Sequence, residues 1–139
     1  ISHIYHQRML EVRSLDTAQQ IEKYINDNIA WDLSIEHLCA HFSISRAELY
    51  QLFHTNVNAS VADYIRSKRI AMAEQLIRTT SMQISEIAAN VGFFDYNYFS
   101  KVFHRKFGVS PREYRKKLED NGTGQEKTAE QGKSNTKKA

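Results

Sequence analysis

Polar and basic side chains share one face of the segment YNYFSKVFHRKF, residues 96–107. At helical spacing its outward positions carry Tyr96, Asn97, Ser100, Lys101 and Arg105. Steps of one, four and five residues are typical of side chains that project together into a groove. Residues 99–117 also contain seven Lys or Arg and a single acid, Glu113. Such groups can donate hydrogen bonds and supply positive charge to an anionic partner, and the alternative interpretation is a solvated basic face.

Other arrangements that could perform chemistry are not apparent in the sequence. His37, Cys39 and His41 are spaced by two residues, and such steps on a helix point in well-separated directions, so the three cannot converge on one metal ion. The sequence has no evident Ser/His/Asp arrangement, phosphate-cradling glycine loop or catalytic pair of carboxylates. Because Cys39 is the only cysteine, a disulfide within the chain is excluded. We therefore expect no enzyme, no metal site and no cofactor.

The composition favours an all-α fold. The 139 residues include only one proline and five glycines, so long helices can run with little interruption. Hydrophobic residues make up 41% and charged residues 25%, as in soluble globular proteins, and no apolar run approaches the roughly 20 residues of a membrane span. The net charge of +3 permits a nucleic-acid partner but does not by itself argue for one.

Capping signals predict about seven helices along the chain. The expected helices cover 17–29 after Asp16, 35–42 after Ser34, 45–53 with Ser45 and Glu48 as a capping box, 60–79, 84–91, 96–107 between Asp95 and Gly108, and 111–118 after Ser110 and Pro111. Residues 3–15 are weakly amphipathic, and one interpretation is a helix whose partner surface belonged to an upstream domain. Residues 119–139 contain no large apolar side chain and are expected to form a disordered tail.

The two halves of the chain repeat one another. Residues 35–64 match residues 84–114, with an offset of 49 at Ile35 and Ile84 and of 50 at Phe53 and Phe103. Each half predicts a short helix, a turn and a longer helix, which is a helix-turn-helix unit. We call the longer helix of each unit its reader helix. In the second unit the expected core residues are Phe93, Phe99, Val102, Phe103, Phe107 and Tyr114, and in the first reader helix Leu49, Leu52 and Phe53 turn inward.

The segments ISEIAANVGF (84–93), YFSKVFHRKFGVSP (98–111) and EYR (113–115) carry a resemblance to a known family. They resemble the C-terminal DNA-binding domain of the AraC/XylS family of bacterial transcription regulators, over about 100 residues in all. The resemblance implies two helix-turn-helix subdomains joined by a long central helix. It divides the chain into 1–15 as a linker or remnant of an upstream domain, 16–118 as the DNA-binding domain, and the tail 119–139. Within the domain it places the first helix-turn-helix at 34–56, the linker helix at 60–79, the second helix-turn-helix at 83–107 and a closing helix at 111–118.

The resemblance also implies which residues touch DNA. It places contacts to base edges at Ala47, Tyr50, Gln51, Tyr96, Asn97 and Lys101. Contacts to the DNA backbone are expected at Arg46, Ser60, Ser100, Arg105, Ser110 and Arg112, because helix N-termini and basic side chains suit phosphate. Asn and Gln can pair bidentately with adenine and Lys can donate to guanine, whereas an alanine offers only a methyl group. The first reader helix is therefore expected to read bases more weakly than the second.

The function expected from this resemblance is sequence-specific binding of double-stranded DNA by a cytoplasmic bacterial regulator. Its two reader helices are expected to enter successive major grooves, about 34 Å apart by the pitch of B-DNA. The family implies an activator that contacts RNA polymerase and an upstream sensory or receiver domain that is missing from this sequence. The alternative hypothesis is a protein-interaction module of the same fold without an operator of its own.

Overall fold

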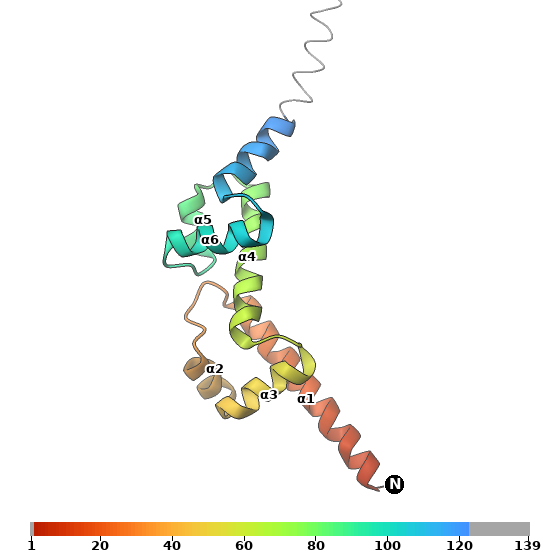
Figure 1. Cartoon of the computed structure of the whole chain (residues 1–139). Coiled ribbons are helices and arrows are strands. Elements are labelled where there is room, and N and C mark those ends of the chain that lie inside the picture. Colours follow the sequence, from red (N-terminus) through yellow and green to blue (C-terminus); the bar gives the residue numbers. More distant parts are fainter. Residues whose placement is uncertain (1, 123–139) are drawn as a thin grey trace, which may run out of the picture. The chain divides into compact units, whose positions relative to one another are not determined.

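The computed structural model describes residues 2–122. Within these residues it consists of helices and contains no strand: α1 (Ser2–Asp27), α2 (Ile35–Phe42), α3 (Arg46–Asn56), α4 (Val61–Thr79), α5 (Ile84–Asn90), α6 (Tyr96–Phe107) and a last helix over 111–122 (Figure 1). The predicted all-α fold is confirmed. Each predicted helix-turn-helix is present, as α2 with α3 and as α5 with α6.

The helices form two compact units. Among the described residues, unit 1 comprises 2–72 and 90–92, and unit 2 comprises 73–89 and 93–122. The long helix α4 begins in unit 1 and ends in unit 2, so each helix-turn-helix has its own core and receives one part of α4. This division matches the duplicated pattern of the sequence.

The core of unit 1 is built from the apolar faces of four helices. Its buried residues are Ile21, Ile25, Ile29, Leu33, Leu38, Leu49, Phe53, Val61 and Ile65. The ring of Phe53 meets the ring of Tyr64 edge-on, with 5.5 Å between their centroids. Helix α3 packs against both α1 and α2, and α2 adds Leu38.

The core of unit 2 repeats this arrangement with more aromatic residues. Phe99 and Phe103 of α6 are fully buried. Phe103 meets Tyr114 edge-on at 5.4 Å between centroids, which reproduces the pair of Phe53 and Tyr64 in unit 1. The predicted core assignment of the aromatic residues is confirmed for Phe93, Phe99 and Phe103, while Val102, Phe107 and Tyr114 are half-buried.

Local capping fixes most helix ends, as the sequence predicts. The hydroxyl groups of Ser34 and Ser45 accept hydrogen bonds from the backbone N–H groups three residues later, each at 3.1 Å. The carboxylate of Asp95 accepts from the backbone N–H groups of Asn97 and Tyr98, two and three residues later, at 2.9 and 3.3 Å. Gly108 ends α6 in the left-handed region, with φ of 79°, which a residue without a side chain adopts at little cost.

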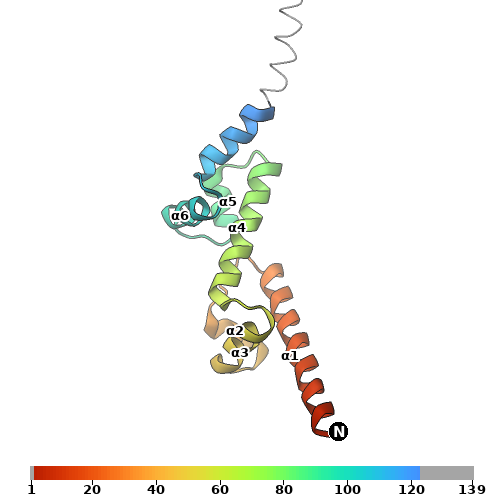
Figure 2. The ribbon, with the colours of Figure 1, turned by 45° about the vertical axis from the view of Figure 1, so that its right-hand side comes forward.

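The predicted helix start at Asp16 is wrong. Helix α1 runs without a break from Ser2, and the Asp16 carboxylate accepts a hydrogen bond from Gln20 Nε2 one turn later instead of capping. An aspartate caps only when the chain before it leaves the helix, and neither Gly nor Pro interrupts residues 2–15. A tertiary contact also holds this part of α1, because Asn56 Nδ2 of α3 donates to the Ser14 hydroxyl at 2.8 Å. The N-terminal half of α1 extends past α2 and α3 in both views (Figures 1 and 2).

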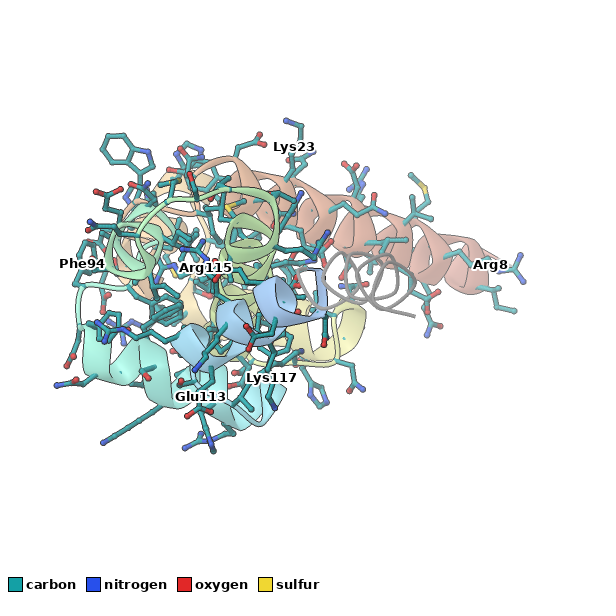
Figure 3. All side chains as sticks on the ribbon, turned by 90° about the horizontal axis from the view of Figure 1, so that it is seen from above. Arg8, Lys23, Phe94, Glu113, Arg115 and Lys117 are labelled. Carbon is teal, nitrogen blue, oxygen red and sulfur yellow. The ribbon has the colours of Figure 1, made fainter. Side chains whose placement is uncertain are left out.

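The last helix continues further than the sequence predicts. It extends to residue 122, so the expected disorder from residue 119 is wrong for residues 119–122, and the remainder of that segment lies outside the described residues. Arg115 holds this helix in unit 2, because its guanidinium donates to the backbone carbonyls of Ile77 and Thr80 at 3.3 and 3.2 Å and also to that of Met82. Glu113, Arg115 and Lys117 of this helix are labelled in Figure 3.

A hydrogen bond between Tyr114 and Glu74 joins the last helix to α4. The Tyr114 hydroxyl donates to Glu74 Oε1 at 2.7 Å, and Arg78 Nε donates to the same oxygen at 3.1 Å. Burial alone would raise the pKa of Glu74, but these hydrogen bonds outweigh it and hold the pKa below the usual value of 4.5. A depressed carboxyl pKa stabilises the folded state above the unfolded pKa, and this contribution is lost as the pH falls through the folded pKa.

We therefore expect Tyr114→Phe to reduce the free energy of unfolding by about 1 kcal/mol at pH 7, because the ionised Glu74 loses a donor. The loss should shrink as the pH falls through the folded pKa of Glu74, because a protonated carboxyl no longer accepts the bond as an anion. Urea unfolding of the parent and the variant at pH 7 and pH 3 measures the difference. Glu74→Gln, which keeps the shape but does not titrate, serves as control and should remove this part of the pH dependence. An equal loss at both pH values would contradict an ionised acceptor.

Candidate nucleic-acid interface

The outward face of α6 is formed because the opposite face is occupied by the core. Phe99 and Phe103 are fully buried, and this orientation leaves Asn97, Lys101 and Arg105 exposed. The predicted site residues Tyr96 and Ser100 are half-buried and lie at the edge of the face. The centre of the candidate surface on α6 is therefore one amide and two cations.

Helix α3 presents an equivalent but less basic face. Ala47 and Gln51 are exposed and Tyr50 is 50% exposed, opposite the buried Leu49 and Phe53. The Gln51 amide donates to the Thr55 hydroxyl at 3.0 Å, so pairing with a base requires it to exchange this bond. The guanidinium of Arg46 forms an exposed ion pair with Glu36, which offsets part of its charge toward a phosphate.

Three grooves show which of the predicted residues lie together. Ala47 and Gln51 line a groove whose other wall is α1, with Arg13 among its lining residues. Tyr50 shares a smaller pocket with His54 of α3 and with Ser60 before α4. In unit 2, Tyr96 lines a groove together with Arg112 and Arg115. Two expected base contacts thus each lie beside an expected contact to the DNA backbone: Tyr50 beside Ser60, and Tyr96 beside Arg112.

The two serines expected at phosphate also cap their own helices. The Ser60 hydroxyl accepts from the backbone N–H of Asp63 at 3.1 Å, and the Ser110 hydroxyl accepts from that of Glu113 at 3.2 Å. The first backbone N–H groups of each helix remain directed outward, as at any helix N-terminus. At the last helix Pro111 has no N–H, so the anion-binding capacity there depends on the N–H and side chain of Arg112.

Two arginines, Arg115 and Arg69, serve the fold instead of the surface. Arg115 belongs to the cluster over 99–117, yet its guanidinium is engaged with three backbone carbonyls. Arg69 donates through Nε to the carbonyl of Ile29 at 3.0 Å and through Nη2 to that of Trp31 at 2.9 Å, and burial lowers its pKa. Lys101, Arg105 and Arg112 remain exposed cations of unit 2.

Sequence reasoning missed three exposed side chains on the same faces. His54 follows Tyr50 by one turn on α3, His104 follows Ser100 by one turn on α6, and Tyr98 of α6 is 47% exposed. The repeat itself contained a signal for the histidines, because His54 and His104 occupy equivalent positions in the two halves. Their outward phase then places both beside expected contact residues.

Both histidines of α2 contact Tyr24 of α1. His37 Nε2 lies 2.6 Å from the Tyr24 hydroxyl, and the His41 ring stacks on the Tyr24 ring at 4.1 Å between centroids. Cys39 packs against the core of unit 1. Among the described residues no group of three or more His, Cys, Asp or Glu side chains could hold a metal ion. None of the described helices combines the length and the apolar character that crossing a membrane requires.

Comparisons with known proteins agree with this geometry. A family model described as a helix-turn-helix domain matches residues 38–117. The HTH-type transcriptional activator RhaR of Cronobacter sakazakii is 38% identical over 100 residues, which are 72% of this chain and 35% of the relative. A transcriptional regulator of Chromobacterium violaceum, from the AraC-type DNA-binding domain-containing proteins, superposes with a TM-score of 0.66 at 27% identity, over 78% of this chain and 94% of that one.

The fold itself also matches a domain solved on DNA. The DNA-binding domain of AdpA in complex with a target DNA superposes with a TM-score of 0.71, over 75% of this chain and 94% of that one, and at 20% identity it shows the fold alone. The chain spans about a third of the length of the curated relatives it matches. The names of these relatives describe them as transcription regulators. The resemblance seen in residues 84–115 is thus confirmed, and the chain belongs to the helix-turn-helix domain family as an AraC-type DNA-binding domain.

Proposed function

We propose that this domain binds double-stranded DNA in a sequence-specific manner, as part of a bacterial transcription regulator that works in the cytoplasm. The observation that carries the proposal is the outward face of α6, where Asn97, Lys101 and Arg105 are exposed opposite a fully buried aromatic face. An amide can pair bidentately with adenine, and a lysine can donate to guanine, in the major groove. The arginine one turn later adds charge for the adjacent phosphates.

The two reader helices divide this work unevenly. Helix α6 reads base edges through Asn97 and Lys101, with Tyr96 at the edge of the contact. Helix α3 presents only Ala47, Tyr50 and Gln51, so it contributes more to positioning than to discrimination. We propose that they enter successive major grooves of one duplex, about 34 Å apart along B-DNA.

Contacts to the DNA backbone hold the domain in register. The proposed residues are Arg46, Ser60, Ser100, Arg105, Ser110 and Arg112. Activation of transcription by contact with RNA polymerase, and control by a sensory or receiver domain, belong to the longer regulator that we propose this domain serves. The relatives' description as activators supports the first of these.

Binding of duplex DNA should depend strongly on salt. If about six phosphates are neutralised, the logarithm of the binding constant should fall with the logarithm of salt concentration at a slope near −5. The experiment selects a preferred duplex from a random pool and titrates it with the chain by fluorescence anisotropy at several salt concentrations. A chain that enriches no sequence and binds without salt dependence would support the alternative, a protein-interaction module.

Two substitutions separate base reading from backbone binding. Asn97→Ala should leave the fold intact, cost about 1–3 kcal/mol on the selected duplex and relax the preference at one base pair. Arg112→Ala should weaken binding to all duplexes alike and reduce the salt slope by about one unit. Lys106→Ala is the matched control, because Lys106 is an exposed cation of α6 about 140° around the helix from Lys101. If Asn97→Ala weakens every duplex equally, Asn97 contacts the backbone and the assignment of α6 is wrong.

A further inference from the structure

The N-terminal part of α1 forms one wall of a groove beside the first reader helix. Arg13 and Thr17 of α1 line this groove together with Ala47, Glu48 and Gln51 of α3. Helices α1 and α3 pack against one another within unit 1 and lie side by side in both views (Figures 1 and 2). Arg13 belongs to the segment expected to be a linker, yet it stands beside two of the proposed base contacts, Ala47 and Gln51.

The groove lies at the side of α3 and not behind it. At about 100° per residue, the α3 residues that line it centre about 80° around the helix from the proposed base contacts Ala47, Tyr50 and Gln51. The other flank of α3 carries His54, which shares a pocket with Tyr50 and with Ser60 at the start of α4. Helix α3 therefore stands between α1 on one side and the start of α4 on the other.

A duplex that receives α3 in its major groove brings its two strands to these two flanks. The major groove is about 12 Å wide and a helix with its side chains is about 10–12 Å across, so a single helix fills the groove. Packed helices lie about 8–10 Å apart, so α1 cannot enter the same groove and instead lies toward the strand that borders it. The proposed contact at Ser60 serves the strand on the side of α4, and none of the backbone contacts proposed above comes from α1.

We propose that Arg13 binds a phosphate of the strand on the side of α1, an inference that rests on the proposed function. Arg13 is exposed and takes part in no ion pair among residues 2–122, although Glu48 lines the same groove. The groove has a volume of about 560 Å³, so the long side chain of Arg13 has room to turn toward the duplex. A guanidinium suits this role, because its planar fork of donors matches two oxygens of a phosphate.

The fold holds Arg13 in place for such a contact. The neighbouring Ser14 hydroxyl accepts a hydrogen bond from Asn56 Nδ2 of α3 at 2.8 Å, which ties this turn of α1 to the first reader helix. Further along α1, Ala18 and Ile21 are buried in unit 1. A cation presented from a helix fixed in this way loses less conformational entropy on binding than one on a flexible linker. Helix α1 is thus a third DNA-contacting element of unit 1, after α3 and the start of α4.

Substitution of Arg13 in the full 139-residue chain tests this contact. Arg13→Ala should weaken binding of the selected duplex and of unrelated duplexes alike, by about fivefold, and reduce the salt slope by about one unit. Arg13→Lys keeps the charge and should restore most of the lost affinity. The matched control is Arg8→Ala, because Arg8 is an exposed cation of α1 about 140° around the helix from Arg13, and Figure 3 shows its side chain directed away from the ribbon. It should leave affinity and salt slope unchanged, and circular dichroism checks that each variant keeps its helix content.

Uncharged phosphates locate the contact on the duplex. Single methylphosphonate groups are placed in turn along each strand of the selected duplex, and binding of the parent and of Arg13→Ala is compared at each position. At the phosphate that Arg13 binds, the replacement should weaken the parent but not the variant, because the partner is already absent. A parent that binds DNA with a steep salt slope, while Arg13→Ala loses neither affinity nor slope, would overturn this inference and leave the proposed function standing. Equal losses in Arg13→Ala and Arg8→Ala would also overturn it, whereas a parent without salt-dependent binding would overturn the proposed function as well.

Discussion

Replacing Phe103 by alanine is expected to unfold unit 2 under mild conditions. Phe103 is fully buried, and its ring contacts those of Phe99, Phe107 and Tyr114, with centroid distances of 5.9, 4.5 and 5.4 Å. Truncating a buried phenylalanine typically costs about 3–5 kcal/mol, because the transfer free energy is lost and a cavity remains. The total stability of a small domain is about 5–15 kcal/mol, so this loss removes much of it. Urea unfolding followed by circular dichroism measures the effect.

Phe94→Ala is the matched control for this experiment. Phe94 belongs to the same unit and is the same residue type, but it is 86% exposed, at the edge of the view in Figure 3. Its truncation should change the free energy of unfolding by no more than about 0.5 kcal/mol, as for most surface positions. Equal losses in the two variants would show that burial of Phe103 is not what holds unit 2 together.

The second large effect is expected at Gly92, which lies in unit 1. Its φ is 97°, and a Cβ built on it would stand 2.7 Å from both Arg69 Nε and the carbonyl oxygen of Ile29. Gly92→Ala should therefore strain the backbone and displace the guanidinium from the carbonyls of Ile29 and Trp31. Backbone strain of about 1–2 kcal/mol and the loss of charged hydrogen bonds together suggest a destabilisation of about 3 kcal/mol. Thermal and urea unfolding of the variant measure it.

Gly108→Ala separates the cost of backbone strain from the cost of displacing the Arg69 guanidinium. Gly108 also has a positive φ, 79°, but nothing lies within 4 Å of a Cβ at this position. Its substitution should cost only the backbone term, about 1–2 kcal/mol. Combining Gly92→Ala with Arg69→Ala should cost less than the sum of the two single changes, because the crowded guanidinium is then absent. If Gly92→Ala and Gly108→Ala cost the same, the close approach to Arg69 has no energetic consequence.

Much of the fold could be predicted because its signals are local. Ser34, Ser45 and Asp95 cap their helices through N–H groups two or three residues away, and such contacts form wherever the segment becomes helical. The helical phase of Phe99 and Phe103 likewise selects the inward face of α6, and therefore the outward face of the candidate site. The repeat indicated that the two halves share one local fold. In agreement with this, Phe53 meets Tyr64 edge-on in the first half, and Phe103 meets Tyr114 edge-on in the second.

The errors and omissions arose where a residue's role depends on distant segments. Asp16 has the features of a helix cap, but the chain before it stays helical, and Ser14 there bonds to Asn56, 42 residues later. His54 and His104 are a different case, because the repeat and their helical phase already indicated an outward position, and only their place at the candidate surface was overlooked. Nothing in the sequence alone distinguishes these two histidines from other polar residues of the same helices.

By itself, the sequence determined that this protein is all-helical, duplicated and of AraC type, and which faces of its two reader helices point inward. The helices and their inward faces rest on periodicity and capping, which act over a few residues. The duplication rests on the match of residues 35–64 to 84–114, and the AraC type rests on the resemblance carried by residues 84–115. Only the tertiary structure decided which basic residues are available to a partner. Arg69 and Arg115 bond to carbonyls between 33 and 40 residues away, whereas Lys101 and Arg112 stay exposed. The physical reason is that a guanidinium binds whichever acceptors the folded chain brings within reach, and no local pattern specifies them.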